Sequence, residues 1–90
     1  MKKLQYTSQF KKDVKRIRNN KKKMSALDNL LEILKTSGTV PQEYNPHPLK
    51  GNYKGHMECH VENDFLLIWI DEEENIIKLI RLGSHSELFG

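Results

Sequence analysis

The chain has 90 residues, of which 37% are hydrophobic and 30% are charged, and its formal net charge is +3. This length allows one small folded domain with a thin core, and the composition is that of a globular chain rather than a disordered one. No apolar run reaches the length of a membrane span, and the basic start lacks the apolar segment of a signal peptide. The one cysteine, Cys59, excludes an internal disulfide, so a cytoplasmic location is expected.

The charge is divided unevenly along the chain. Residues 1–35 hold eleven Lys or Arg and three acidic residues, a net charge of +8, whereas residues 36–90 hold four and nine, a net charge of −5. A basic half is typical of a protein that binds nucleic acid or an acidic protein partner. Charge alone leaves open the alternative of a solvated helix face.

The chain begins with a predicted short strand at residues 3–6, followed by a helix. Ser8 is the predicted N-cap, and Phe10, Val14 and Ile17 recur at helical spacing as a narrow apolar stripe. The remaining faces of this helix are basic, and they carry Lys11, Lys12, Lys15, Arg16 and Arg18.

A second helix is predicted from another apolar repeat. Asn19, Asn20 and the three lysines after them are expected to form a turn, after which Ser25 caps the helix and Gly38 ends it. The apolar stripe that this helix would bury consists of Met24, Leu27, Leu30, Leu31 and Leu34. Two antiparallel helices are therefore expected.

Residues 39–50 hold all three prolines and predict an irregular connector. Two of the prolines flank His47 and restrict its backbone, which makes this a rigid place from which to present a side chain. Residues 56–62 then alternate as a half-buried strand does. One face of that strand carries His56, Glu58, His60 and Glu62, and the other carries Met57, Cys59 and Val61.

The C-terminal part predicts two apolar strands, at residues 65–70 and 76–82, joined by an acidic hairpin loop at residues 71–75. Ser84 and Glu87 have the spacing of a capping box for a last helical turn. This order of elements predicts an α+β domain. Two N-terminal antiparallel helices would pack on one face of a small antiparallel sheet, and polar side chains would occupy the other face.

Two possible reactive sites are disfavoured by the strand pattern. His56 and His60 have the spacing of half a zinc site only on a helix, because on a strand their Cα atoms lie about 13 Å apart. Cys59 falls on the apolar face, which favours a buried inert thiol over a nucleophile. No metal and no other cofactor are therefore expected.

Four polar residues remain as candidates for chemistry. His60 and Asp64 flank a turn, so either the carboxylate orients the imidazole or both are ordinary surface residues. Arg81 lies in an apolar strand and needs either an ion pair, with Asp64 or a glutamate, or a site that uses its charge. His85 follows four residues later and can reach the same cleft.

The kind of chemistry is limited by what the sequence lacks. It has no glycine-rich phosphate loop and no carboxylate cluster typical of a two-metal site. Any phosphodiester chemistry is therefore expected to be metal-free. This favours RNA as substrate, because its 2′-hydroxyl can attack the adjacent phosphorus with acid, base and charge stabilisation alone.

Four motifs in this order resemble the RelE/ParE superfamily of bacterial type II toxins, and most closely its YafQ-like mRNA interferases. They are the opening Y-T-S-x-F-x-K-D-V-K (residues 6–15), H-P-L-K-G (47–51), H-V-E-x-D-x-x-L-I (60–68) and R-L-G-S-H-S-E-L-F (81–89). The resemblance implies one RelE-like toxin domain, residues 1–90, that cuts mRNA in the ribosomal A site and is silenced by a cognate antitoxin. Two alternatives remain: a ParE-like toxin that binds a protein such as DNA gyrase, and a non-catalytic RNA- or DNA-binding module.

The resemblance also implies roles for individual residues. The active-site positions of the family fall on His47, His60, Asp64, Arg81, His85 and Phe89, whereas His56 matches none of them. In the implied mechanism the Asp64–His60 side activates the 2′-hydroxyl, His85 protonates the leaving 5′-oxygen, and Arg81 with His47 stabilises the phosphorane. The sequence leaves open which group is the base and which is the acid.

RNA binding is expected from aromatic and basic residues. Phe89 is expected to hold a nucleobase, as is Phe65, which stands where a family member has tryptophan. The basic first helix, through Lys11, Lys12, Lys15 and Arg16, would grip ribosomal RNA. The expected partners are thus mRNA, the ribosome and an antitoxin protein, without a membrane.

Overall fold

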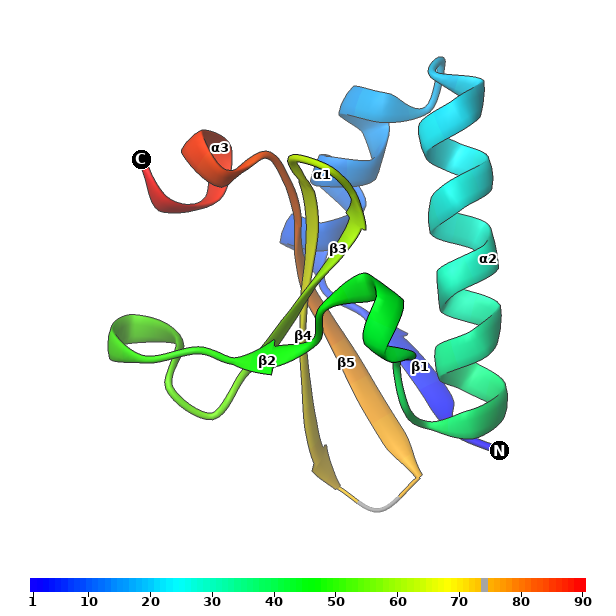
Figure 1. Cartoon of the computed structure of the whole chain (residues 1–90), viewed down its shortest axis with the longest axis vertical. Coiled ribbons are helices and arrows are strands. Elements are labelled where there is room, and N and C mark those ends of the chain that lie inside the picture. Colours follow the sequence, from blue (N-terminus) through cyan, green and yellow to red (C-terminus); the bar gives the residue numbers. More distant parts are fainter. Residues whose placement is uncertain (74) are drawn as a thin grey trace.

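The structure is a computed structural model that describes residues 1–73 and 75–90. Its elements are β1 (Lys3–Tyr6), α1 (Ser8–Ile17), α2 (Lys21–Ser37), a 3-10 turn η1 (Gln42–Tyr44), β2 (His47–Pro48), a second 3-10 turn η2 (Gly51–Tyr53), β3 (Met57–Glu62), β4 (Phe65–Glu73), β5 (Ile76–Gly83) and α3 (His85–Phe89). A short turn follows α1, and α2 then runs back in the opposite direction, whereas α3 lies apart from both helices (Figure 1). The predicted α+β class is confirmed. None of the helices in the described ranges is long and apolar enough to cross a membrane.

The five strands form one sheet in the order β1-β5-β4-β3-β2. β3, β4 and β5 pair antiparallel, as predicted, and β2, which was not predicted, pairs antiparallel with β3. β1 pairs parallel to β5, so the sheet is mixed. The chain passes through both helices between β1 and the rest of the sheet, and such a long crossover permits parallel pairing. β1 reaches only as far as Leu79 of β5. The last residues of β5 therefore have no strand on that side within the described chain.

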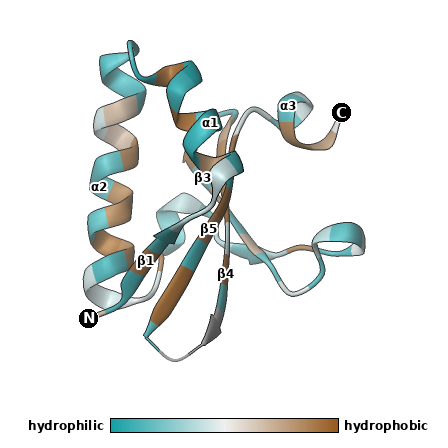
Figure 2. Cartoon of the chain, turned by 180° about the vertical axis from the view of Figure 1, so that it is seen from behind, coloured by the Kyte–Doolittle hydropathy of each residue, from teal (hydrophilic) through white to brown (hydrophobic). Residues whose placement is uncertain are grey.

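The main core lies between the sheet and the helices α1 and α2. It contains Phe10, Leu27, Leu30, Leu34, Cys59, Val61, Phe65, Leu67, Trp69, Ile77, Leu79 and Leu82. From behind, β5 is largely hydrophobic, and α2 carries both hydrophobic and hydrophilic residues along its length (Figure 2). The opposite face of the sheet is less polar than predicted, because a second apolar cluster supports α3 there. That cluster contains Leu66, Ile68 and Leu88, with Leu49, Tyr53 and Ile80 packed against it.

The N-cap of α1 is Thr7 rather than the predicted Ser8. The Thr7 hydroxyl accepts a hydrogen bond from the Phe10 N–H at 3.1 Å and donates one to the Leu79 carbonyl at 2.8 Å. The second contact is long-range and could not be read from local sequence. It ties the start of α1 to the open edge of β5.

The N-cap of α2 is Asn20 rather than the predicted Ser25. Its side chain accepts a hydrogen bond from the Lys23 N–H at 3.1 Å, so the three lysines form the first turn of the helix and not the connecting turn. Gly38 ends the helix as predicted, with φ of 76° and its N–H donated to the Leu34 carbonyl at 2.8 Å. A left-handed residue at this position favours glycine, which has no Cβ to clash.

Two predicted loops are partly regular structure. The connector at residues 39–50 contains η1 and β2, so His47 lies in a strand that pairs with β3. β4 runs to Glu73, and the hairpin predicted at residues 71–75 is therefore largely strand. Glu74 lies outside the described residues.

Candidate functional site

The short helix α3 is held in place by a capping box and by Asp64. As predicted, the Ser84 hydroxyl accepts the Glu87 N–H at 3.2 Å, and the Glu87 carboxylate accepts the Ser84 N–H at 2.7 Å. A Cβ at Gly83 would lie 2.9 Å from Glu87 Oε1, so the glycine leaves room for the carboxylate to fold back. Asp64 Oδ1 accepts the His85 N–H at 2.9 Å. The turn between β3 and β4 thus fixes the start of the helix that carries His85.

The side chains of His60 and Asp64 do not pair as the sequence suggested. Asp64 is used by the backbone of α3, and His60 Nδ1 lies 2.8 Å from the Asn63 carbonyl. A carbonyl only accepts, so Nδ1 carries the proton in this contact and Nε2 keeps its lone pair. The Asn63 carbonyl therefore takes the orienting role that was predicted for Asp64.

A row of rings runs from α3 to the start of β3. Ring centroids are 5.0 Å apart for His85 and Phe89, 5.7 Å for Phe89 and Tyr53, and 5.6 Å for Tyr53 and His56. Phe89 is 41% exposed and offers a ring to solvent. His56, which matched no family position, is packed against Tyr53. It does not belong to the group formed by His47, Glu58 and His60.

Phe65 differs from Phe89 in burial. It is 2% exposed, and the Lys23 ammonium lies 5.2 Å from its ring centroid. The cation covers the ring from the side of α2. Stacking of Phe65 on a nucleobase would require its ring to leave the core, so Phe89 is the better placed of the two predicted aromatic contacts.

Arg81 forms an ion pair, but its partner is Asp13 and neither Asp64 nor a glutamate. Arg81 Nε and Nη2 lie 2.9 and 3.3 Å from the two oxygens of Asp13, and the Leu82 N–H donates to Asp13 at 2.9 Å. Asp13 is 1% exposed. Its carboxylate lies at the edge of β5 beyond the end of β1. There it accepts the backbone N–H of Leu82, which β1 does not reach. This contact could not be predicted from local sequence, because Asp13 and Arg81 are 68 residues apart.

This contact determines the charge of both partners. Burial by itself would raise the pKa of Asp13, but the hydrogen bonds from Arg81, Leu82 and Gln9 outweigh it and lower that pKa. The hydrogen bond to Asp13 raises the pKa of Arg81, and one to Tyr53 raises it further. Arg81 is therefore a fixed cation between the buried carboxylate and the aromatic row.

The basic residues of α1 fall into two groups. Arg16 is engaged within the protein, because it pairs with Asp13 and with Glu87, the latter at 3.3 Å. It thereby connects α1 to the capping box of α3. Lys11, Lys12 and Lys15 are exposed and remain available to a partner.

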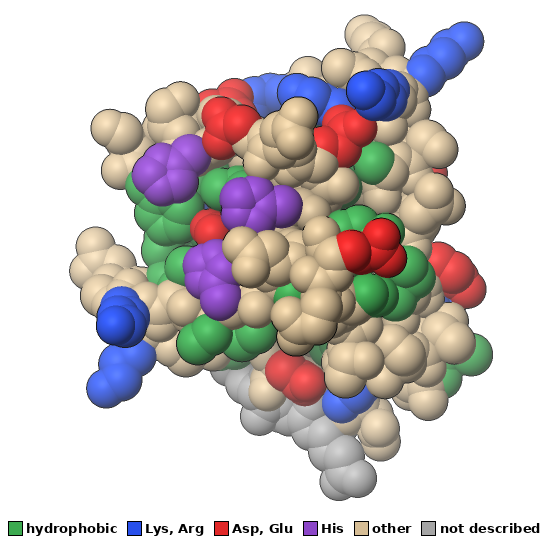
Figure 3. Space-filling view, viewed as in Figure 1, with side chains coloured by type: hydrophobic (Ala, Val, Ile, Leu, Met, Phe, Trp, Pro, Cys, Tyr) green, Lys and Arg blue, Asp and Glu red, His purple; other side chains and the backbone are tan. Residues whose placement is uncertain are grey.

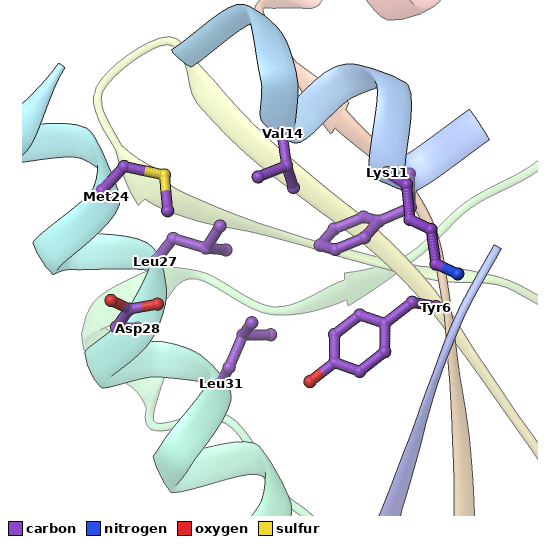
Figure 4. Close-up of a pocket in the computed structure, with 8 residues that line it drawn as sticks. Tyr6, Lys11, Val14, Met24, Leu27, Asp28 and Leu31 are labelled. Carbon is purple, nitrogen blue, oxygen red and sulfur yellow. The ribbon is translucent and has the colours of Figure 1, made fainter. Parts of the chain in front are cut away.

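A polar cleft lined by two lysines and two carboxylates lies beside Asp64 and was not predicted. It has a volume of about 360 Å³ and is lined by Lys22, Lys23, Glu62, Asn63, Asp64, Phe65 and Ser84. It depends on α2 starting at Lys21, a residue that was predicted to lie in a turn. A separate groove of about 280 Å³ between α1 and α2 is mainly apolar, and no histidine lines it (Figure 4). Of the predicted site residues it contains only Lys11.

Histidine side chains gather on one face of the molecule, with an acidic side chain among them (Figure 3). In this group His47 Nε2 lies 3.2 Å from Glu58 Oε1, and one ligand atom from each of His47, Glu58 and His60 lies within 4.8 Å of the others. His47 is opposite Glu58 across the β2–β3 pair, and His60 is two residues further along the same face. This is the set of described residues that could hold a metal ion.

The same arrangement of strands and helices occurs in solved structures of similar proteins. Residues 2–90 match the family model described as bacterial toxin of type II toxin–antitoxin system, YafQ. The chain belongs to this family. It is 35% identical over 88 residues to the mRNA interferase toxin YafQ of Escherichia coli K12, a match that covers 97% of this chain and 95% of that protein.

Solved structures of the YafQ family share the fold. In the E. coli DinJ-YafQ complex, the matched chain has a TM-score of 0.86 and 34% identity, with both chains covered completely. A metal-bound toxin from Helicobacter pylori has a TM-score of 0.84 and 38% identity, with 99% of this chain and 100% of that chain covered. The family inferred from the four sequence motifs is thus confirmed.

Proposed function

We propose that the chain is a toxin that cuts mRNA as a ribosome-dependent endoribonuclease in the cytoplasm and is held inactive by a cognate antitoxin. The observation that carries this proposal is the exposed pair His85 and Phe89 on a helix fixed by Asp64, next to a fixed Arg81 cation. The 35% identity to an mRNA interferase supports the reaction type. The complex of the E. coli relative with DinJ supports an antitoxin as partner.

The proposed reaction is attack of a 2′-hydroxyl on the adjacent phosphorus with loss of the 5′-oxygen. His60 is the proposed base, because the Asn63 carbonyl holds its Nδ1 proton and leaves Nε2 free to accept one. His85 is the proposed acid. No ring hydrogen bond occupies it within residues 1–73 and 75–90, and Phe89 lies against its ring. The role of Asp64 is then to position His85 through the backbone.

Arg81 is the proposed stabiliser of the phosphorane. Its contact with Asp13 uses the Nε–H and one Nη2–H of the five guanidinium N–H groups, which leaves three to donate to phosphate oxygens or to Tyr53. Because Asp13 fixes the guanidinium before RNA binds, little reorganisation is needed in the transition state. His47 is proposed to add charge from β2, and Phe89 to stack on a base.

RNA is proposed to follow the basic surface toward the histidines. Lys22 and Lys23 line the cleft beside Asp64, at the start of α2. Three lysines in a first helical turn oppose the positive end of the helix dipole, an arrangement that a bound phosphate would stabilise. Lys11, Lys12 and Lys15 are proposed to contact ribosomal RNA.

The test is cleavage of a defined mRNA by the purified chain, with and without ribosomes. We expect cleavage only with ribosomes, and a loss of about 100-fold or more for His85→Ala, since general acid catalysis contributes that much. His56→Ala is the matched control, because His56 also lies in the aromatic row but has no proposed role in the reaction.

Three outcomes would contradict the proposal in different ways. Equal cleavage by folded His85→Ala and wild type would remove the acid assignment. Cleavage of free mRNA would remove the ribosome dependence. Inhibition of DNA gyrase without cleavage, or RNA binding without either effect, would favour the ParE-like toxin or the non-catalytic module.

The metal-bound Helicobacter pylori relative bears on this mechanism in one respect. An ion on His47 or His60 of this chain would take the lone pair that an acid–base step needs. A metal-loaded form would therefore be an inactive form.

A further inference from the structure

We propose that Tyr53 is a further catalytic residue, whose hydroxyl donates a hydrogen bond to a non-bridging oxygen of the scissile phosphate beside the guanidinium of Arg81. This role rests on the ribonuclease function proposed above. None of the four sequence motifs contains Tyr53, because the second ends at Gly51 and the third begins at His60. Only the contacts of this side chain in the folded chain indicate such a role.

The backbone around Tyr53 is fixed by its own hydrogen bonds. Tyr53 ends the 3-10 turn η2, in which the Lys54 N–H donates to the Gly51 carbonyl at 3.0 Å. The His56 N–H donates to the Tyr53 carbonyl at 2.9 Å, and the Leu49 N–H closes the loop on the His56 carbonyl at 2.9 Å. Because these bonds join backbone groups, they persist when neighbouring side chains are replaced.

The ring of Tyr53 is held between the sheet and α3. It is half-buried and packs against the apolar cluster that supports this helix. Its centroid lies 5.7 Å from that of Phe89, and the two rings are nearly perpendicular, at 84°. An edge-to-face contact of this kind is favourable for two aromatic rings. The phenol therefore extends from a fixed ring, next to the residue proposed to stack on a base.

The hydroxyl of Tyr53 is a hydrogen-bond partner of Arg81. A guanidinium can only donate, so the Tyr53 oxygen accepts in this contact and keeps its own proton. Among residues 1–73 and 75–90, no hydrogen bond from the Tyr53 hydroxyl to an acceptor uses that proton. Asp13 meanwhile occupies Nε and Nη2 of the guanidinium. A phosphate oxygen that binds the remaining N–H groups of Arg81 would thus meet a second donor in Tyr53.

Such a donor contributes most in the transition state. As the 2′-oxygen adds to phosphorus, negative charge accumulates on the non-bridging oxygens, and hydrogen bonds to them strengthen. Arg81 supplies positive charge there, and Tyr53 adds a donor whose direction is set by its ring. The phenol keeps its proton throughout, and no covalent bond forms or breaks at Tyr53.

The experiment is single-turnover cleavage of ribosome-bound mRNA at varied toxin concentration, with Tyr53→Phe compared to wild type. This variant keeps the ring and loses only the hydroxyl. We expect the maximal rate to fall about 10-fold or more, because one donor to the developing charge is lost. The half-saturating concentration should stay within about twofold of wild type. Tyr6→Phe is the matched control, since Tyr6 is 49% exposed and lies outside the aromatic row, and it should cleave as wild type does. Circular dichroism establishes that each variant is folded.

A second arm replaces each non-bridging oxygen of the scissile phosphate in turn by sulfur, which accepts hydrogen bonds weakly. We expect one of the two diastereomers to slow the wild type more than it slows Tyr53→Phe, because the variant has already lost the contact. Equal sulfur effects in both proteins, for both diastereomers, would overturn the contact of Tyr53 with the phosphate.

Two further outcomes separate this role from the function on which it rests. Cleavage by the wild type, with an unchanged maximal rate in Tyr53→Phe, would overturn the role of Tyr53 alone. A wild-type chain that does not cleave ribosome-bound mRNA would overturn the proposed function, and the role of Tyr53 with it.

Discussion

Asp13 and Glu58 are both buried carboxylates, 1% and 5% exposed, but their surroundings differ. Both oxygens of Asp13 are occupied, by Arg81, the Leu82 N–H, Arg16 and Gln9. Glu58 has only His47 on one oxygen and nothing on the other among the described residues. Burial alone therefore does not tell what a carboxylate does. A saturated carboxylate fixes its neighbours, whereas an unsaturated one is ready to accept a ligand.

The strongest test of this comparison is Asp13→Asn. We expect a loss of about 3 kcal/mol in the free energy of unfolding, because Arg81 loses its counter-charge in a largely buried position. Urea unfolding at neutral pH measures it. Asp28→Asn is the control, since Asp28 is exposed on α2 and its change should stay within about 0.5 kcal/mol. Equal small effects of both substitutions would show that the contacts of Asp13 with Arg81 and Leu82 do not stabilise the fold.

The pH dependence of that loss sharpens the same point. The pKa of Asp13 is lowered from its ordinary value of 3.8, so its ionised form stabilises the fold above that value. The stabilisation is lost as pH falls through the lower, folded-state pKa. The gap in unfolding free energy between wild type and Asp13→Asn should therefore be constant from neutral pH to about 5 and shrink below about 4. A gap that does not change at acid pH would contradict the lowered pKa.

For Glu58 the expected effect is much smaller. Glu58→Gln weakens the contact with His47, which lowers the free energy of unfolding. It also removes a buried charge that is only partly compensated, which raises the free energy of unfolding by a similar amount. We expect the free energy of unfolding to stay within about 1 kcal/mol of wild type. Thermal melting in the presence of EDTA measures this without any metal contribution. A loss as large as that of Asp13→Asn would mean that Glu58 is a structural anchor too.

Cys59 is the neighbour of Glu58 on the opposite face of β3 and should show the smallest response. Burial, and then the charge of Glu58, raise the pKa of this thiol to about 12. We expect no reaction with a thiol reagent at neutral pH in the folded chain, and full reaction after denaturation. Rapid labelling of the native protein would show that this part of the core opens readily.

The sequence predicted the parts of the fold that depend on local pattern. Strand alternation separated Cys59 from His60, the capping box identified α3, and Gly38 marked the end of α2. The predicted starts of both helices were wrong, for different reasons. Thr7 wins over Ser8 because it also bonds the distant Leu79 carbonyl, and a basic first turn disguised the start of α2.

The sequence indicated which residues belong to the site, but it did not indicate what each of them contacts. The resemblance named His47, His60 and Arg81, but register decides what each one touches. Glu58 was seen on the face of His60, yet its pairing with His47 depends on β2 lying beside β3. Asp13 was missed because it lies in an apolar stripe on a basic helix, where nothing marks it as the partner of Arg81.

The short reach of β1 has a consequence for association between copies of the chain. The end of β5 would present free backbone groups to which a strand from another molecule could add. Thr7 bonds the carbonyls of Leu79 and Ile80 there, and Asp13 takes the N–H of Leu82. Side chains of α1 and the residue before it thus fill the positions that an incoming strand would use, and they guard this edge of the sheet against aggregation.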